Sequence, residues 1–359
     1  MNAPERFTLN MTRFIRAPRE KVFDAFTTEA GLAAWMGPRG MRVRSSHADP
    51  RVGGAWRVEI CNRDGYALVV GGQYKQLQRP TSIVYTWQWE GANSPMPGVE
   101  TLIEVALTEK EGGTQMQMTH SGFPAAAARE GHVQGWNSTF NRLNDHLDPR
   151  GSAGTLTLLG NPRSPFVRTA RMAFAEKGVA YTLQACAPHS PEIMAVHPFE
   201  RIPALRDGEI EIWETAAIVN YIDECFDSGV SLRPGSIIDR TRCAQWISAS
   251  NSYLFDSMIG RYLLQVLFPR GADGKPDRSV IDTALAEIPA QLRALDKAYE
   301  RSDYLAGSAL SAADLFVAPV LASLQFMPEG GTLMADYPNV LRAQAAIRQR
   351  PSFSSTQPQ

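Results

Sequence analysis

Residues 155–168 read Thr-Leu-Thr-Leu-Leu-Gly-Asn-Pro-Arg-Ser-Pro-Phe-Val-Arg, and this stretch decides the fold of the larger part of the chain. Its apolar start predicts a short strand. Ser164 followed by Pro165 is an ordinary helix start, with Ser as the N-cap and Pro in the first turn. The helix is expected from about Pro165 to Lys177, where Gly178 ends it. Ser164 therefore lies at a strand-to-helix turn.

The chain after this helix continues in a regular order. A strand is expected near 181–183, and two hairpin-like runs at 204–206 and 211–213 flank a turn at Asp207-Gly208. A helix from Thr215 to about Cys225 closes the unit. The order βαβ followed by ββα is typical of a thioredoxin-like layout. From Pro234 onward the sequence predicts helices near 237–267, 277–300, 311–325 and 338–349.

The part before residue 148 has a different pattern. Apolar and polar residues alternate over several runs that end in Gly-containing turns, which predicts half-buried antiparallel strands. Residues 19–35 instead have helical spacing and are expected to bury Val22, Phe23 and Phe26. Residues 131–147 carry a second helical stripe, at Val133, Trp136, Phe140, Leu143 and Leu147. A curved antiparallel sheet around one long C-terminal helix would bury both faces.

Composition narrows the function classes. The chain has 359 residues, of which 44% are apolar and 20% charged, as in a globular protein of two or three domains. Its 36 Lys and Arg against 37 Asp and Glu leave no basic field for a phosphate backbone, so nucleic acid is not an expected partner. Four scattered cysteines fit a reducing compartment. No signal peptide or transmembrane run is visible, so we expect a cytoplasmic protein.

Three positions could carry chemistry. A helix N-terminus favours an anion, and the Ser164 hydroxyl could donate to a bound thiol and favour the thiolate. Ile202 precedes Pro203 at a predicted edge strand, where a cis bond is often retained and a peptide-like ligand could pair with the backbone. Glu214 and Thr215 open a helix, where a carboxylate and a hydroxyl can meet α-amino and α-carboxylate groups. The alternative is that Ser164 and Glu214-Thr215 only cap helices.

These three motifs, in this order, resemble the glutathione S-transferase family over roughly residues 154–350. The segment 164–168 looks like the serine-type active-site motif of tau-like and related bacterial members. The resemblance implies that Ser164 stabilises the glutathione thiolate. It also implies that Ile202, ahead of Pro203, pairs with the cysteinyl backbone and that Arg201 lies near the glycyl carboxylate.

The same resemblance implies that Glu214 and Thr215 hold the γ-glutamyl end of glutathione. Residues 311–314 match the family's N-capping box, a folding element. The loop His197-Pro198-Phe199-Glu200 departs from the common Asn-Pro and small residue, and Thr stands at 215 where Ser is usual. His189 lies where relatives often place a second glycyl-end ligand. Position alone suggests an apolar substrate site lined by Tyr253, Phe255 and Tyr262.

The N-terminal part resembles the START-like, helix-grip domains, in the branch named after activators of a heat-shock-protein ATPase. The motifs that carry the resemblance lie at 16–26, 35–38, 49–56, 85–87, 119–123 and 135–137. It implies a cavity between the sheet and the long helix that takes a small apolar ligand.

The alternative for this part is that the aromatic residues Trp56, Tyr85, Trp87, Trp136 and Phe140 only fill the core. His120 and His132 have no third ligand at a sensible spacing, so no metal site is expected. The basic run from Arg39 to Arg44 is interpreted as a solvated face.

We therefore expect a fusion: a START-like α+β domain at 8–148, a linker at 149–154, a thioredoxin-like α/β domain at 155–227 and an all-α domain at 236–350. The expected function is conjugation of glutathione, as co-substrate, to a small apolar electrophile. Family members usually dimerise through this module, so the resemblance implies a homodimer, and detoxification or stress response is the expected role.

Two other hypotheses stay open at this point. One is a non-catalytic ligand-binding or stress-response regulatory protein, in which the transferase-like half serves as a dimer scaffold. The other is that the N-terminal cavity captures an apolar electrophile and delivers it to the glutathione site.

Overall fold

The computed structural model describes residues 7–92, 94–269, 271 and 274–358. The chain divides into two compact units. The first unit consists of Met1–Thr157 together with Ala180–Thr182 and Arg206–Glu211. The second unit consists of Leu158–Val179, Leu183–Leu205 and Ile212–Gln359.

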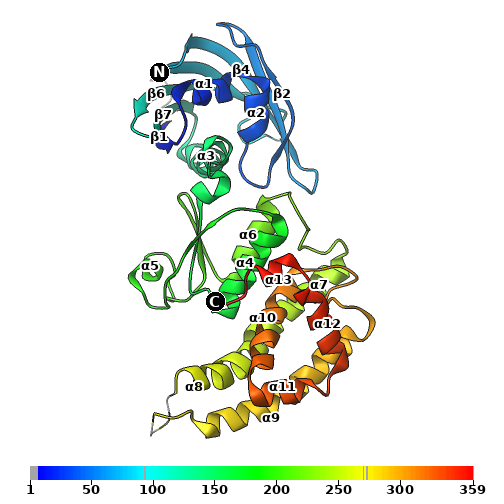
Figure 1. The fold of residues 1–359 in the computed structure, drawn as a ribbon. Helices are drawn as coiled ribbons and strands as arrows, with labels where there is room; N and C mark the ends of the chain where they lie inside the picture. Colours follow the sequence, from blue (N-terminus) through cyan, green and yellow to red (C-terminus); the bar gives the residue numbers. More distant parts are fainter. Residues whose placement is uncertain (1–6, 93, 270, 272–273, 359) are drawn as a thin grey trace. The chain divides into compact units, whose positions relative to one another are not determined.

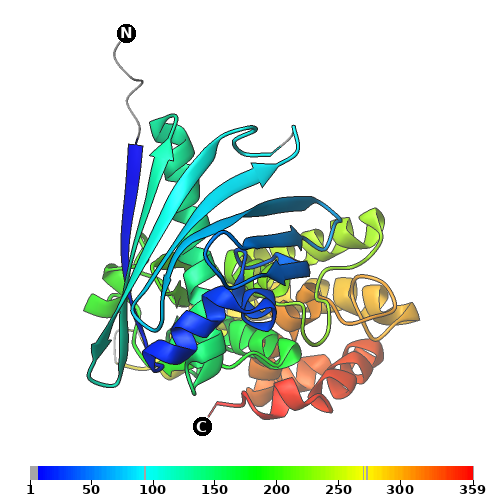
Figure 2. The same ribbon diagram turned by 90° about the horizontal axis from the view of Figure 1, so that it is seen from above.

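A seven-stranded antiparallel sheet forms most of the first unit (Figures 1 and 2). The strand order is β1-β7-β6-β5-β4-β3-β2, so β2 to β7 form a meander and β1 pairs with β7. The predicted alternation is confirmed, because β6 buries every second residue from Thr101 to Leu107. The strands are β1 (Phe7–Ile15), β2 (Arg42–Ala48), β3 (Ala55–Cys61), β4 (Ala67–Gln78), β5 (Ser82–Glu90), β6 (Glu100–Lys110) and β7 (Gly113–Phe123).

The long helix α3 (Ala126–Leu147) supplies the other side of this core and contacts β1 and β7. Its Trp136 ring lies 5.0 Å from Trp87 on the sheet and 5.1 Å from Phe140 one turn further along α3. The predicted helix and its stripe are confirmed, since Trp136, Phe140 and Leu143 are buried. A 3-10 turn, η1 (Gly151–Gly154), lies in the stretch predicted as a linker.

Residues 19–35 form two helices, where the spacing predicted one. The first is α1 (Arg19–Thr27) and the second is α2 (Glu29–Trp35). Thr28 separates them, because its extended backbone (φ −114°, ψ 149°) ends α1 while its side chain accepts a hydrogen bond from the Gly31 N–H and caps α2. The predicted burial of Val22, Phe23 and Phe26 is confirmed.

A four-stranded sheet in the order β11-β10-β8-β9 carries the thioredoxin-like part. Its helix α4 begins and ends as predicted, with Ser164 as the N-cap and Gly178 (φ +63°) at the C-terminal end. The elements are β8 (Leu156–Leu159), α4 (Pro165–Lys177), β9 (Thr182–Gln184), α5 (Pro191–Met194), β10 (Ala204–Asp207), β11 (Ile210–Trp213) and α6 (Thr215–Cys225).

The rest of the second unit is helical, as predicted (Figure 1). Ser311 and Asp314 form the predicted capping box at the start of α10. Among the described residues, no helix combines the length and apolar character that a membrane crossing requires. The helices are α7 (Ile237–Ala249), the π-helix η2 (Ser250–Leu263), α8 (Leu264–Leu267), α9 (Arg278–Ala298), the 3-10 turn η3 (Tyr299–Arg301), α10 (Ala312–Phe326), α11 (Pro328–Met334), α12 (Pro338–Arg348) and α13 (Pro351–Ser354).

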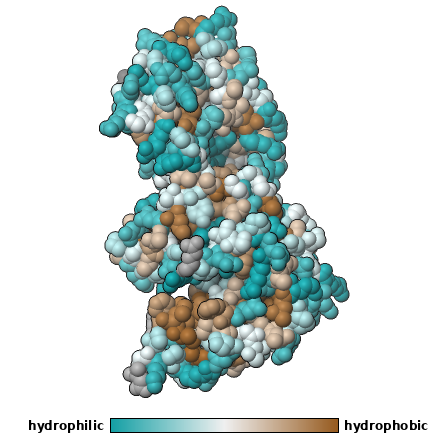
Figure 3. All heavy atoms as spheres, viewed as in Figure 1, coloured by the Kyte–Doolittle hydropathy of each residue, from teal (hydrophilic) through white to brown (hydrophobic). Residues whose placement is uncertain are grey.

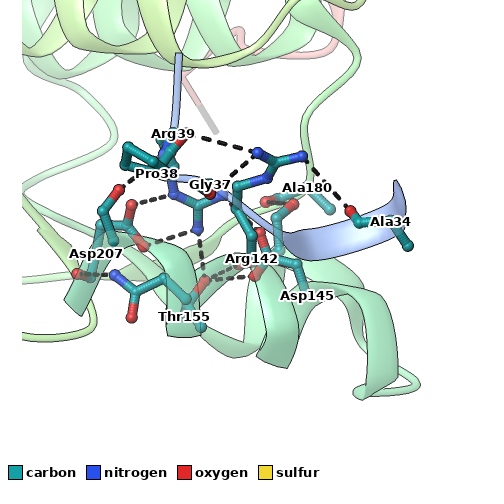
Figure 4. Close-up of polar contacts among 12 residues, drawn as sticks. Ala34, Gly37, Pro38, Arg39, Arg142, Asp145, Thr155, Ala180 and Asp207 are labelled. Atoms are coloured by element: carbon teal, nitrogen blue, oxygen red, sulfur yellow. Dashed lines mark hydrogen bonds and ion pairs between the residues drawn. The ribbon is translucent and has the colours of Figure 1, made fainter. Parts of the chain in front are cut away.

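Arg39 corrects the interpretation of the basic run from Arg39 to Arg44 as a solvated face. Its side chain is only 3% exposed and forms ion pairs with Asp145 and Asp207 within the first unit (Figure 4). The guanidinium also donates to the Thr155 hydroxyl (3.1 Å). Arg44, by contrast, has an exposed side chain that pairs with Glu59, as expected of a surface residue. The sequence alone gave no sign that two carboxylates from distant segments would meet Arg39.

We predict that Arg39→Met destabilises the protein by about 3–5 kcal/mol, because Asp207, whose side chain is 0% exposed, would keep a buried charge without its guanidinium partner. The matched control is Arg44→Met, which breaks an exposed pair and should lower the free energy of unfolding by no more than about 1 kcal/mol. Urea denaturation followed by tryptophan fluorescence measures both. Equal losses in the two variants would contradict the role of the buried pair.

Candidate functional site

The turn before α4 holds Ser164 in place by three hydrogen bonds. The Asn161 carbonyl accepts from the Ser164 N–H (2.9 Å), and the Asn161 side chain accepts from the Arg163 N–H (2.9 Å). The Ser164 hydroxyl oxygen accepts from the Val167 N–H (3.4 Å). A hydroxyl can accept and donate at once, so its proton remains available to a ligand at the positive end of the helix. Capping and thiol binding are therefore compatible in one side chain.

Gly160 brings the first turn of α4 close to the Ile202 loop. Its φ of +152° lies in the region that side chains rarely adopt, and an added Cβ would stand 2.5 Å from the Val167 side chain. The same Cβ would stand 3.3 Å from the Ile202 side chain. Ile202 packs against the small core cluster that contains Leu159 and Ala204. A glycine at the end of β8 is thus what lets these two segments approach each other.

Ile202 offers an unpaired stretch of backbone. The Ile202–Pro203 peptide bond is cis, and Pro203 is buried while Ile202 is half-buried. Within the described part of the chain, neither the N–H nor the C=O of Ile202 has a hydrogen-bond partner. A half-buried donor and acceptor side by side can pair with an extended peptide, as an added strand does.

Glu214 has a strained backbone next to the helix start. Its φ is +69°, which is uncommon for a residue other than glycine, and its side chain does not cap α6. The Glu214 side chain is exposed and Thr215 is buried. Arg201 is exposed as well. Among the described residues neither Arg201 nor Glu214 takes part in an ion pair, so charges of both signs are available to a zwitterionic ligand.

The charges of Arg201 and Glu214 both act on the imidazole of His197. Burial lowers the pKa of its imidazole, and the charge of Arg201 lowers it further while that of Glu214 opposes the shift. The His197 Nδ1 accepts a hydrogen bond from the Phe199 N–H (3.1 Å), so the neutral ring closes the loop. His197, which stands where the family commonly has Asn, is therefore held in the loop by this hydrogen bond. His189, by contrast, pairs with the Glu200 carboxylate (2.7 Å).

The three aromatic residues suggested by position lie in different surroundings. Phe255 stacks on Phe166 in the first turn of α4, with ring centroids 4.2 Å apart and planes 11° apart. Tyr253 is exposed. Tyr262 is 0% exposed and donates to Glu329, so it belongs to the helical core and cannot line an open substrate site. The helical spacing of Tyr262 could have signalled a core position.

The first unit contains an apolar cavity of about 500 Å³ between the sheet and α3. Trp87 and Trp89 of β5, and Trp136 of α3, lie in its wall. Further lining residues come from α3 and from the segment that includes Met36, Gly37, Pro38 and Met41.

His120 and His132 are satisfied core histidines. His120 accepts from the Trp136 indole (3.2 Å) and contacts the Thr101 hydroxyl (2.8 Å). His132 accepts from the Trp89 indole (3.0 Å) and lies 2.8 Å from the Ala128 carbonyl. Both rings are thereby neutral and oriented. Among the described residues, no group of three or more His, Cys, Asp or Glu side chains could hold a metal ion.

Comparisons with known proteins agree with both halves of the sequence resemblance. Residues 154–224 match the N-terminal domain of glutathione S-transferases and residues 278–342 their C-terminal domain. Glutathione S-transferase 1 of Zea mays is 32% identical over 170 residues, which cover 47% of this chain and 78% of that protein. The chain belongs to the glutathione S-transferase family. It is an enzyme of this family, with glutathione as co-substrate.

Other relatives support the same assignment. Glutathione S-transferase 3 of Zea mays is 29% identical over 207 residues, which cover 56% of this chain and 92% of that protein. A solved glutathione S-transferase from Methylobacillus flagellatus, with glutathione bound, has a TM-score of 0.50 and 26% identity, and covers 57% of this chain and 100% of that one. Residues 16–148 match the family described as Activator of Hsp90 ATPase homolog 1-like protein. This transferase is therefore a fusion of that domain with the two transferase domains.

We predict that the neutral His120 makes the protein less stable in acid. Burial lowers the pKa of His120 to about 3, with the neighbouring His132 adding to the shift. In the unfolded chain the His120 imidazole binds a proton near pH 6.5, whereas in the folded chain it stays neutral at that pH. Stability should therefore fall as the pH drops from about 6.5 toward 3, by up to about 1.4 kcal/mol per pH unit from this group.

The measurement is urea denaturation at pH 7, 6, 5 and 4. The comparison is His120→Gln, which removes the titrating group and can keep hydrogen bonds to Trp136 and Thr101. The variant should show a shallower loss of stability in acid. Parallel curves for the two proteins would contradict the prediction.

Proposed function

We propose that this transferase conjugates glutathione to a small apolar electrophile, with Ser164 as the residue that stabilises the thiolate. The Ser164 hydroxyl donates to the sulfur, and the α4 N-terminus favours its negative charge. Ile202 pairs with the cysteinyl backbone ahead of Pro203. Arg201 binds the glycyl carboxylate, and Glu214 with Thr215 binds the γ-glutamyl end.

The observation that carries this proposal is the unpaired backbone of Ile202 beside the first turn of α4. A tripeptide that pairs there extends toward a cation at one end and an anion at the other, which matches Arg201 and Glu214. Holding the thiolate in one position converts a bimolecular attack into an effectively intramolecular one once the electrophile is bound. The stacked Phe166 and Phe255 rings offer the electrophile an apolar surface two residues from Ser164.

We also propose that the first-unit cavity binds a small hydrophobic ligand and that the domains span 8–148, 155–227 and 236–350. A volume of about 500 Å³ with an apolar wall is in the range of small-molecule sites. We place the protein in the cytoplasm, where its four free cysteines would stay reduced.

We predict that Ser164→Ala lowers kcat/KM with 1-chloro-2,4-dinitrobenzene about 10- to 100-fold. This factor corresponds to the free energy of one hydrogen bond to a charged sulfur. Glutathione binding, measured by calorimetry, should change little, because most of its contacts lie elsewhere. The matched control is Ser236→Ala, which removes the same kind of N-cap from α7. A similar fall in both variants would show a general folding effect, and no fall in Ser164→Ala would refute the role of Ser164.

We further predict a homodimer that depends on Phe199. Its side chain is 63% exposed and packs edge-on against Trp213, which is 38% exposed, and exposed aromatic pairs often mark interfaces. A second apolar patch, at Leu264, Leu267 and Phe268, lies on the helical part (Figure 3). Light scattering should show a dimer for the wild type and for Phe268→Ser, and a monomer for Phe199→Ser. A wild-type monomer, or a Phe199→Ser dimer, would contradict this prediction.

A further inference from the structure

Arg168 is a buried cation at the start of α4. It is the fourth residue of this helix and only 5% exposed. Its N–H donates to the Ser164 carbonyl (2.9 Å), so the two residues lie one turn apart on the same face of the helix. Side chains of a helix incline toward its N-terminus. The guanidinium charge is therefore on the order of 10 Å from the Ser164 hydroxyl, since one turn rises about 5.4 Å.

This cation lacks the carboxylate partner that the other buried cations have. Of the described Lys and Arg residues, three are buried: Arg39, Arg168 and Lys177. Arg39 pairs with two aspartates and Lys177 with one. Arg168 forms no ion pair with any described residue, and the charges that act on it are those of Arg171 and Arg348. Burial and these two like charges lower the pKa of Arg168 to about 10, so it stays protonated near neutral pH without an anion beside it.

Neutral groups hold the guanidinium in place. Its Nη2 donates to the Phe353 carbonyl (3.0 Å), and its central carbon lies 3.9 Å from the centre of the Phe353 ring. Its Nε donates to the Thr356 hydroxyl (3.5 Å). Phe353 belongs to α13, which contacts α4, and Thr356 follows that helix (Figure 1). These contacts fix the position of the cation and leave its charge uncompensated.

The placement of this charge is unfavourable for the helix by itself. The N-terminus of a helix is positive, so a cation in its first turn is repelled there and an anion is attracted. The first turn of α4 contains no acidic residue. A buried charge without an opposite charge adds a further cost. Such departures from the rules of stability are expected at functional sites, and an anion docked at Ser164 would reduce both costs.

Resting on the proposed thiolate site at Ser164, we propose that the buried charge of Arg168 is a second source of the positive potential that stabilises the glutathione thiolate. The guanidinium acts through space and does not touch the sulfur. Its effect reaches the sulfur because the protein interior screens a charge less than water does. Ser164 thus supplies the hydrogen bond, and Arg168 supplies a full positive charge behind it.

The test cancels this charge in two ways and measures, by ultraviolet absorbance, the pH at which bound glutathione ionises. Arg168→Gln removes the charge and keeps an amide that can donate to the Phe353 carbonyl. Thr356→Asp keeps the arginine and places a carboxylate beside its Nε, where the wild type has a hydroxyl. Each variant should raise the pKa of the bound thiol by about 0.5 to 1, the effect of one partly screened charge at this distance.

Each variant has a matched control. Arg168→Lys keeps the charge at the same position. Thr356→Asn is close to Thr356→Asp in size and carries no charge. In both controls the bound thiol should ionise at the wild-type pH within the error of the measurement.

The pH dependence of the rate is an independent readout. At pH 6.5, kcat/KM of Arg168→Gln with 1-chloro-2,4-dinitrobenzene should be about 2- to 10-fold below that of the wild type, because less of the bound thiol is ionised. At pH 9.5 the thiol is ionised in both proteins, so the difference should nearly vanish. A purely structural loss would be the same at both pH values and would contradict the proposed role of the charge.

The outcomes separate this inference from the proposed function. If glutathione bound to the wild type ionises at the same pH as free glutathione, the thiolate site itself fails. If the wild type lowers that pH and Ser164→Ala reverses the effect, but Arg168→Gln and Thr356→Asp leave it unchanged, the thiolate site stands and the role of Arg168 is overturned. Equal shifts in Thr356→Asp and Thr356→Asn would also overturn it, since Arg168 would then only fasten α13 to α4. If Arg168→Gln does not fold, the two Thr356 variants decide alone.

Discussion

The N-terminus of α4 is the constraint on which the transferase site depends. A helix that starts directly after a buried strand leaves its unpaired N–H groups at the edge of the sheet, where they favour an anion. The Ser164 hydroxyl can do two things at this position: its oxygen caps the helix, and its proton is available to a sulfur atom. Gly160 then allows the Ile202 loop to reach the same turn. A side chain at residue 160 would push the Ile202 loop away from this turn, because its Cβ would stand 2.5 Å from the Val167 side chain and 3.3 Å from the Ile202 side chain.

The two units offer their ligands different environments. In the second unit the proposed site combines an unpaired backbone, unpaired side chains of both charges and a helix end, all of which suit a zwitterionic tripeptide. The cavity of the first unit has an apolar wall that contains one histidine, His132, and no Asp, Glu, Lys or Arg side chain among the described residues. The first environment would hold a ligand mainly by electrostatic and hydrogen-bond complementarity, and the second mainly by burial of apolar surface.

Local patterns in the sequence predicted much of this, and long-range contacts account for what they missed. The bounds of α4 and α6 could be predicted because caps and apolar spacing are local signals. The break at Thr28 was missed because a Thr inside an apolar pattern can continue a helix or cap a new one. The burial of Arg39 depends on carboxylates more than 100 residues away. The unpaired Ile202 backbone is visible only when all neighbours are in place.

The most direct test of the central claim is an ultraviolet absorbance titration of glutathione bound to the wild-type protein, which reports the pH at which its thiol ionises. A free thiol ionises near pH 8.5, and a hydrogen bond from Ser164 at a helix N-terminus should lower this value by at least about one unit. Ionisation at or below about pH 7.5 is the result that the account predicts. A bound thiol that ionises at the same pH as free glutathione, or no binding at millimolar glutathione, would contradict it.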